Sequence, residues 1–281
     1  MWGKTLAILR RLGAGFHREG EAAGFRWEPM LVAAWTIAAL TISHYHRKDW
    51  SKPLLRWIGG KPFARYCWYV GLDLGFLLQV CVPILAIAVL ALVAHRGALP
   101  KGEELGSGAS VERGGPKGVK RFSALLRGLE KYGLGLGNVR FGVVAVLICY
   151  LLYLPCFIVF YRSTGFQEYY GNITKTVMTW HRLVLWEIPA VFFVMLRTEF
   201  LFRGFLLFGF KRAYGTSAAI LASVIPYAMA HYAKPEIETF GSFPVGLALA
   251  YLAARTGSIW YGVWLHWTIA LMLSGLLLIM H

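Results

Sequence analysis

The sequence predicts an all-α fold, a polytopic bundle of about seven or eight transmembrane helices. The 281-residue chain is 57% hydrophobic, with a mean hydropathy of +0.54, whereas soluble domains are about 45–50% apolar. Apolar runs near the roughly 20 residues needed to cross a bilayer recur along the chain. Ionisable residues are few within these runs and gather between them.

The expected spans follow from the apolar runs in order: 29–44, 67–95, 141–161, 183–209, 217–232, 240–254 and 258–280. The run 67–95 is long and contains Asp73 and Pro83, so it is either a tilted span or a span with an interfacial extension. The run 183–209 is also long, and Pro189 should break or kink it, which would raise the count to eight.

One long polar stretch divides the chain into three parts. We expect residues 1–96 to form an N-terminal membrane-associated part with about two spans, 97–140 a basic Gly-rich linker, and 141–281 the core. The Lys and Arg residues of the linker place it in the cytoplasm. The basic loop 45–66 would then lie on the opposite side if 67–95 crosses once.

The net charge of +15 points to anionic lipid as a partner rather than to nucleic acid. Lys and Arg of membrane proteins collect in cytoplasmic loops, where they face anionic headgroups. We therefore expect an integral membrane protein that contacts anionic lipid and binds no nucleic acid.

No metal and no cofactor are predicted. The four cysteines lie in apolar segments without a CxxC pair, which is typical of free thiols: Cys67, Cys81, Cys149 and Cys156. No HExxH motif occurs, which argues against a zinc protease of that type. Two histidines and a glutamate could in principle hold a metal ion, but nothing in the sequence requires one.

Ionisable residues inside membrane spans indicate functional sites, because their burial must be compensated by a partner or by water. The predicted spans contain Asp73, Glu187, Glu199, Arg203, His231 and His266. Asp73 is the only aspartate within a span, which excludes a two-aspartate intramembrane protease. Glu187 lies next to a proline near the start of a span, where an interfacial position is expected.

Glu199 and Arg203 lie four residues apart in "RTEFLFRGF", so they share one helix face. A structural ion pair is one interpretation, although buried pairs are weakly stabilising on balance. His231 ends "SVIPYAMAHY" and is either a site residue or an interfacial histidine bonded to a loop. His266 in "GVWLHWTIAL" is either a site residue or a satisfied structural group.

Depth in the membrane favours the functional interpretation. With about 1.5 Å of rise per residue, Glu199, His231 and His266 lie about 18, 21 and 14 Å from the cytoplasmic ends of their helices. A carboxylate and imidazoles from three packed helices could surround one water molecule, activate it for attack on a carbonyl, and stabilise the oxyanion.

The C-terminal half, over roughly 140–280, resembles the CPBP family of CAAX prenyl endopeptidases of the Rce type and bacteriocin-processing and immunity proteins. Three motifs carry the resemblance: "TEFLFRG" from Thr198, "YAMAH" ending at His231, and "HWTIA" from His266. The family patterns are E-E-x-x-x-R, an aromatic followed three residues later by His, and H-x-x-x-N or a variant.

This resemblance implies a glutamate-dependent intramembrane protease in which Glu199, His231 and His266 act on water and the oxyanion, with Arg203 holding Glu199 ionised. Two positions depart from the family patterns. Thr198 replaces the first glutamate, to which the base role is usually given, and Ala270 replaces the asparagine. Glu199 can take the place of residue 198 only through a helix rotation or a local bulge, because successive helix residues point about 100° apart.

Two functions follow from the resemblance. The first is an endopeptidase of a bacterial inner membrane that cleaves near the C-terminal region of membrane-anchored or lipidated proteins. The second is an inactive pseudoprotease that acts as a scaffold, immunity or regulatory protein. An unrelated transporter would show internal repeats, and the sequence has none. The sequence leaves the oligomeric state, the substrate and the cleavage site open.

Overall fold

The computed structural model describes residues 27–69, 72–97, 117–161, 168, 181, 183–232 and 234–280, and these residues contain helices and no strand. The all-α prediction is confirmed. The elements are α2 (Trp27–Tyr69), α3 (Leu74–Phe76), η1 (Leu77–Cys81), α4 (Val82–Gly97), α5 (Lys117–Glu130), α6 (Val139–Tyr161), η2 (Leu183–Glu187), α9 (Ile188–Glu199), η3 (Phe200–Leu207), α10 (Phe208–Met229), α11 (Glu236–Thr256) and α12 (Trp260–Met280). The segments labelled η are π-helical.

Three segments of the described chain are long and apolar enough to cross a membrane: Leu74–Ala94, Val139–Phe157 and Glu236–Thr256. The chain is thus an integral membrane protein, whereas the predicted count of seven or eight spans is not confirmed. The prediction for 67–95 was wrong at its start, because the apolar helix begins at Leu74. Asp73 is the residue just before α3. Its carboxylate caps this helix by accepting a hydrogen bond from the Phe76 amide at 3.2 Å.

The long predicted span 183–209 is a continuous helical run rather than two helices broken at Pro189. Pro189 lies in the first turn of α9, directly after π-helical η2. The real interruption comes later, at Gly215 within α10, where φ is 80° and ψ is 176°. Glycine tolerates this conformation, so the chain turns there before the second part of α10.

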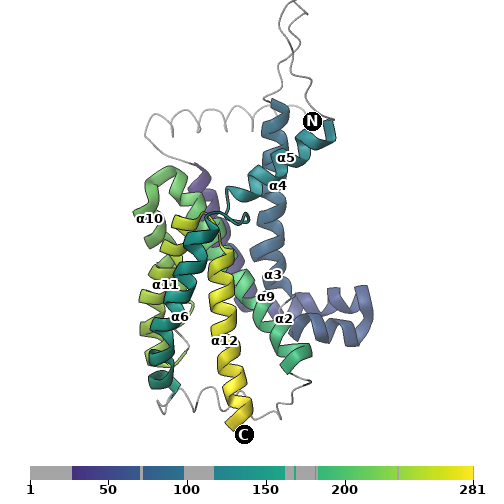
Figure 1. Cartoon of the computed structure of the whole chain (residues 1–281). Helices are drawn as coiled ribbons and strands as arrows, with labels where there is room; N and C mark the ends of the chain where they lie inside the picture. Colours follow the sequence, from purple (N-terminus) through teal and green to yellow (C-terminus); the bar gives the residue numbers. More distant parts are fainter. Residues whose placement is uncertain are drawn as a thin grey trace, which may run out of the picture.

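The core lies where η3 and α10 pack against α11 and α2. Phe200, Leu201, Leu207, Val224 and Ile259 are completely buried within it. Figure 1 shows α6, α10, α11 and α12 grouped on one side and α4 with α5 on the other, with α9 beside α12 and the later part of α2 running out past α3. The helix that carries Glu199 is thus enclosed by the N-terminal and C-terminal halves of the chain.

The segment predicted as a linker contains helix α5 and a turn that packs on the C-terminal helices, while residues 98–116 lie outside the described chain. In this turn the carbonyls of Gly133 and Leu134 accept hydrogen bonds from the Ile259 amide and the Trp260 indole, both at 2.9 Å. The Leu136 carbonyl accepts one from the Tyr261 hydroxyl at 2.8 Å. The turn therefore holds the start of α12, while the division into three domains stays a prediction.

Candidate active site

Glu199 and Arg203 form a buried ion pair at the junction of α9 and η3. Nη1 of Arg203 donates to Oε1 of Glu199 at 3.2 Å, and the two side chains are 0% and 1% exposed. The apolar run around them is buried as well, from Phe200 to Leu207. Neither charge can be solvated by bulk water, so each depends on its neighbours inside the protein.

The helix widens directly after Glu199. The π-helical segment η3 begins at Phe200 and continues for eight residues. A π-helix bonds i to i+5 and therefore accommodates an extra residue per turn, and such segments often occur at functional sites.

His266 reaches the same carboxylate from α12. Its Nδ1 lies 3.1 Å from Oε1 of Glu199. Because an ionised carboxylate only accepts, Nδ1 donates and Nε2 remains available on the other side of the ring. Gly262, one turn earlier on α12, makes this approach possible, because a Cβ there would lie 2.6 Å from Oε2 of Glu199.

His231 lies just beyond the end of α10 and joins the site through Tyr227. Its Nδ1 donates to the Tyr227 carbonyl at 2.9 Å, which leaves Nε2 of the neutral ring as an acceptor. The ring centroid of Tyr227 lies 4.6 Å from that of His231 and 6.3 Å from that of His266. The Arg203 guanidinium stacks on the Tyr227 ring at 3.9 Å.

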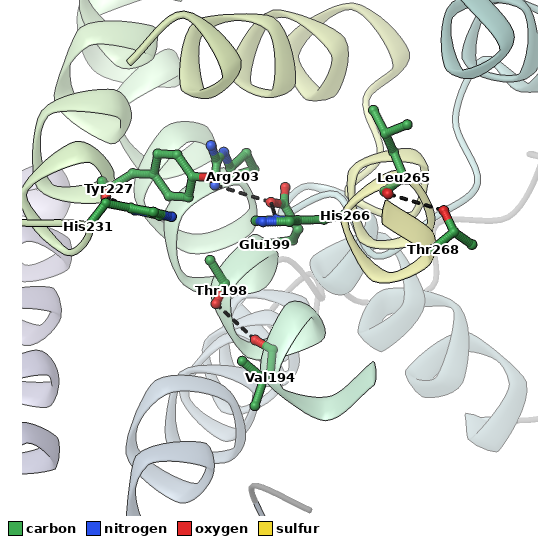
Figure 2. A network of polar contacts seen from close by, with 9 residues as sticks. All are labelled: Val194, Thr198, Glu199, Arg203, Tyr227, His231, Leu265, His266 and Thr268. Atoms are coloured by element: carbon green, nitrogen blue, oxygen red, sulfur yellow. Dashed lines mark hydrogen bonds and ion pairs between the residues drawn. The ribbon is translucent and has the colours of Figure 1, made fainter. Parts of the chain in front are cut away.

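Figure 2 shows the arrangement that results, with His231 and His266 directed from opposite sides toward Glu199 and Arg203. Three polar atoms of this pair have no hydrogen-bond partner among the described residues: Oε2 of Glu199 and Nε and Nη2 of Arg203. Buried polar atoms are normally paired with protein or with ordered water. The free oxygen and the free N–H groups are therefore the polar atoms of this site that remain to be paired.

The structure brings three of the predicted site residues into direct contact and the fourth close to them through Tyr227. Glu199, Arg203 and His266 are in direct contact, and His231 contacts Tyr227 rather than Glu199. Thr198 points elsewhere, because its hydroxyl donates to the Val194 carbonyl of its own helix at 2.8 Å. Ala270 lies one turn after His266 and is half-buried.

Sequence reasoning missed one ion pair beside the site. Nη1 of Arg197 lies 3.3 Å from Oδ1 of Asp73, a pairing that the sequence did not predict. The signal was present, because Asp73 and Arg197 both lie in predicted membrane spans, where each charge is expected to find an opposite charge. Glu187 is the last residue of η2 and is half-buried, away from this pair in the sequence.

The described part of the chain contains no group of three or more metal-binding side chains. The site combines one carboxylate, one guanidinium and two imidazoles with the Tyr227 ring.

Comparison with known proteins gives one family. Residues 180–272, which contain all four site residues, match the family described as Type II CAAX prenyl endopeptidase Rce1-like. No curated protein and no solved structure matches the chain. The matched segment is about a third of the 281 residues and spans η2 to most of α12. Residues 180–272 of this integral membrane protein are thus similar to the Rce1-like family of type II CAAX prenyl endopeptidases.

Proposed function

We propose that the protein is an intramembrane endopeptidase that hydrolyses a peptide bond near the C-terminal region of membrane-anchored or lipidated proteins. The observation that carries this proposal is the meeting of Glu199 with His266 at 3.1 Å, with His231 next to them across the Tyr227 ring. These groups come from α9, α12 and the end of α10. The similarity of residues 180–272 to an endopeptidase family supports the same reaction.

The reaction follows from the hydrogen bonds of each side chain. Oε2 of Glu199 orients a water molecule, and Nε2 of His231 accepts its proton as the water oxygen bonds to the scissile carbonyl carbon. His266 is held through Nδ1 by Glu199 and presents Nε2 to the oxyanion, to which it would donate in its imidazolium form. The carbon–nitrogen bond then breaks, and His231 returns its proton to the leaving amine.

Arg203 keeps Glu199 in the carboxylate form that this sequence needs. Its guanidinium is fixed by Oε1 of Glu199 on one side and by the Tyr227 ring on the other. Stacking of a guanidinium on an aromatic face is most favourable where water is excluded, as it is at this buried position.

The test is a deletion strain compared with its parent by proteomics of membrane proteins, with the search restricted to altered C-termini. Re-expression of the wild-type chain should restore processing, and Glu199→Ala and His231→Ala should each abolish it. Glu130→Ala and His44→Ala, at exposed positions, are the matched controls. Intact processing with both site variants would refute the protease.

The alternative is a pseudoprotease that binds a membrane protein or peptide with the same residues and acts as a scaffold, immunity or regulatory protein. Thr198 is the reason to consider this alternative, because its hydroxyl donates to a carbonyl of its own helix and cannot act as a carboxylate base. This alternative predicts that no C-terminus changes on deletion while a partner still co-purifies with the Glu199→Ala chain.

We further propose that the protein resides in a bacterial inner membrane and contacts anionic lipid through α5. This helix buries Ala124 and Gly128 against α4 and exposes Phe122 and Leu126. Arg121 and Arg127 are exposed beside these apolar side chains. A basic amphipathic helix of this kind is suited to the headgroup region of an anionic leaflet.

A further inference from the structure

A second buried ion pair joins the N-terminal half of the chain to the helix that carries Glu199. Nη1 of Arg197 lies 3.3 Å from Oδ1 of Asp73, and the two side chains are 16% and 0% exposed. The same carboxylate oxygen accepts from the Phe76 amide at 3.2 Å, which fixes it at the start of α3. The contact is also close, because a Cβ at Gly75 would lie 2.7 Å from Nη1 of Arg197.

Further polar groups of the N-terminal half surround this pair. Nε2 of Gln79 donates to Oγ of Ser43 at 3.0 Å, and both residues are buried. Oγ of Ser43 lies 3.5 Å from the position of a Cβ at Gly75. Arg197 therefore lies close to polar side chains of α2 and η1 and to the N-cap of α3, none of which belongs to the segment that matches the endopeptidase family.

The position of this pair on α9 determines which way Glu199 faces. Arg197 and Glu199 are two residues apart, so their side chains leave the helix about 200° from each other. Holding Arg197 on the side of α3 therefore directs Glu199 to the opposite side, where α12 supplies Gly262 and His266. Thr198 points about 100° from either neighbour.

We propose that Asp73 and Arg197 are positioning residues that set the rotation of α9 and so select Glu199, rather than residue 198, as the side chain that faces α12. The N-terminal helices thereby complete the geometry of a site whose reacting groups all lie in residues 180–272. This inference relies on the proposed function only for the importance of Glu199, and its test does not require catalysis.

The test measures disulfide formation between α9 and α12 in the full-length chain, with the four native cysteines replaced by alanine. One reporter combines Glu199→Cys with Gly262→Cys. The other combines Thr198→Cys and Glu199→Ala with Gly262→Cys, so that both lack the carboxylate. Each is oxidised in membranes, and the ratio of the two yields reports the rotation of α9, since a disulfide needs a Cβ separation of roughly 3.5–4.5 Å.

Asp73→Asn is the informative variant, because asparagine keeps the N-cap of α3 and removes only the charge. With Asp73 present, cross-linking through residue 199 should exceed that through residue 198 by about tenfold or more. The excess should fall to about threefold or less with Asp73→Asn or with Arg197→Gln, and it should be retained with Arg197→Lys.

An unchanged ratio in Asp73→Asn would overturn the inference. An equal fall of both yields is the same result, because the ratio is then unchanged. The variant would have lost folded protein without rotating α9. Neither result depends on finding a substrate, so failure here is distinguishable from failure of the proposed protease activity, which the processing assay measures.

Discussion

Oε1 of Glu199 lies 3.1 Å from Nδ1 of His266 and also accepts a hydrogen bond from Arg203. One carboxylate oxygen thus orients a histidine of α12 and neutralises a cation of η3, while the second oxygen stays unpartnered within the described chain. This division between the two oxygens is the basis of the predictions for the site.

His266→Gln should lower the rate of substrate processing by about 100-fold to 1,000-fold, the usual effect of removing one oxyanion donor. Quantification of intact and processed substrate after pulse labelling would measure it. His44→Gln, at an exposed position of α2, is the matched control. A processing rate within about twofold of wild type in His266→Gln would rule out the assigned oxyanion role.

Gly262→Ala should displace the Glu199 carboxylate, since the new methyl group would lie 2.6 Å from Oε2. Overpacking of this kind destabilises by about 1–3 kcal/mol, so we expect a lower unfolding temperature together with slower processing. Gly275→Ala is the control on the same helix, because a Cβ there meets nothing within 4 Å. Equal behaviour of the two alanine variants would contradict the close packing of α12 on Glu199.

Arg203→Gln should lower the free energy of unfolding by about 3–5 kcal/mol, because it leaves the buried Glu199 charge without its cation. Thermal unfolding of the purified protein in detergent micelles would report the loss. The matched control is Lys234→Gln, which removes another i,i+4 pair, with Glu238 at 2.5 Å. Those side chains are 35% and 24% exposed, and a change of about 0.3–0.5 kcal/mol is expected.

Thr198→Glu should not increase processing, because residue 198 points away from the carboxylate position that α12 contacts. The measurement is the same processing assay, with Thr198→Gln as the uncharged control of similar size. A clear gain with glutamate alone would identify the native chain as a degenerate enzyme and favour the pseudoprotease.

Replacing Arg121 and Arg127 together by Glu should weaken binding of α5 to anionic lipid. Each basic residue near an anionic surface contributes about 1 kcal/mol, so the double variant should lose binding by more than tenfold. Full-length protein reconstituted in nanodiscs with and without phosphatidylglycerol, with a fluorophore on α5, would measure the contact. Equal fluorescence in both lipid compositions for the wild-type chain would exclude the lipid assignment.

Much of the site could be predicted from the sequence because its members are rare in their surroundings. A glutamate, an arginine and two histidines within apolar runs must find partners, and the spacing of Glu199 and Arg203 placed them on one face. Similar depth in three helices then suggested that they meet. The direct pairing of Glu199 with His266 is a result of packing between α9 and α12 that no local pattern contains.

The features that were not predicted arise from backbone geometry and long-range pairing. No local signal distinguishes π-helical η3 from an ordinary α-helix, and Gly215 interrupts α10 through a positive φ. Asp73 and Arg197 are 124 residues apart, so their ion pair depends on how α3 docks on α9. Hydropathy placed the start of the second apolar run too early because the end of α2 is itself rich in aromatic residues.

The turn after α5 connects the polar middle segment of the chain to α12, the helix that carries His266. Its carbonyls hold the amide of Ile259 and the side chains of Trp260 and Tyr261, and His266 follows Trp260 by about 9 Å along α12. A displacement of this turn would therefore act first on the start of α12, the helix that carries His266. The proposed lipid contact of α5 and the proposed hydrolysis would then depend on each other.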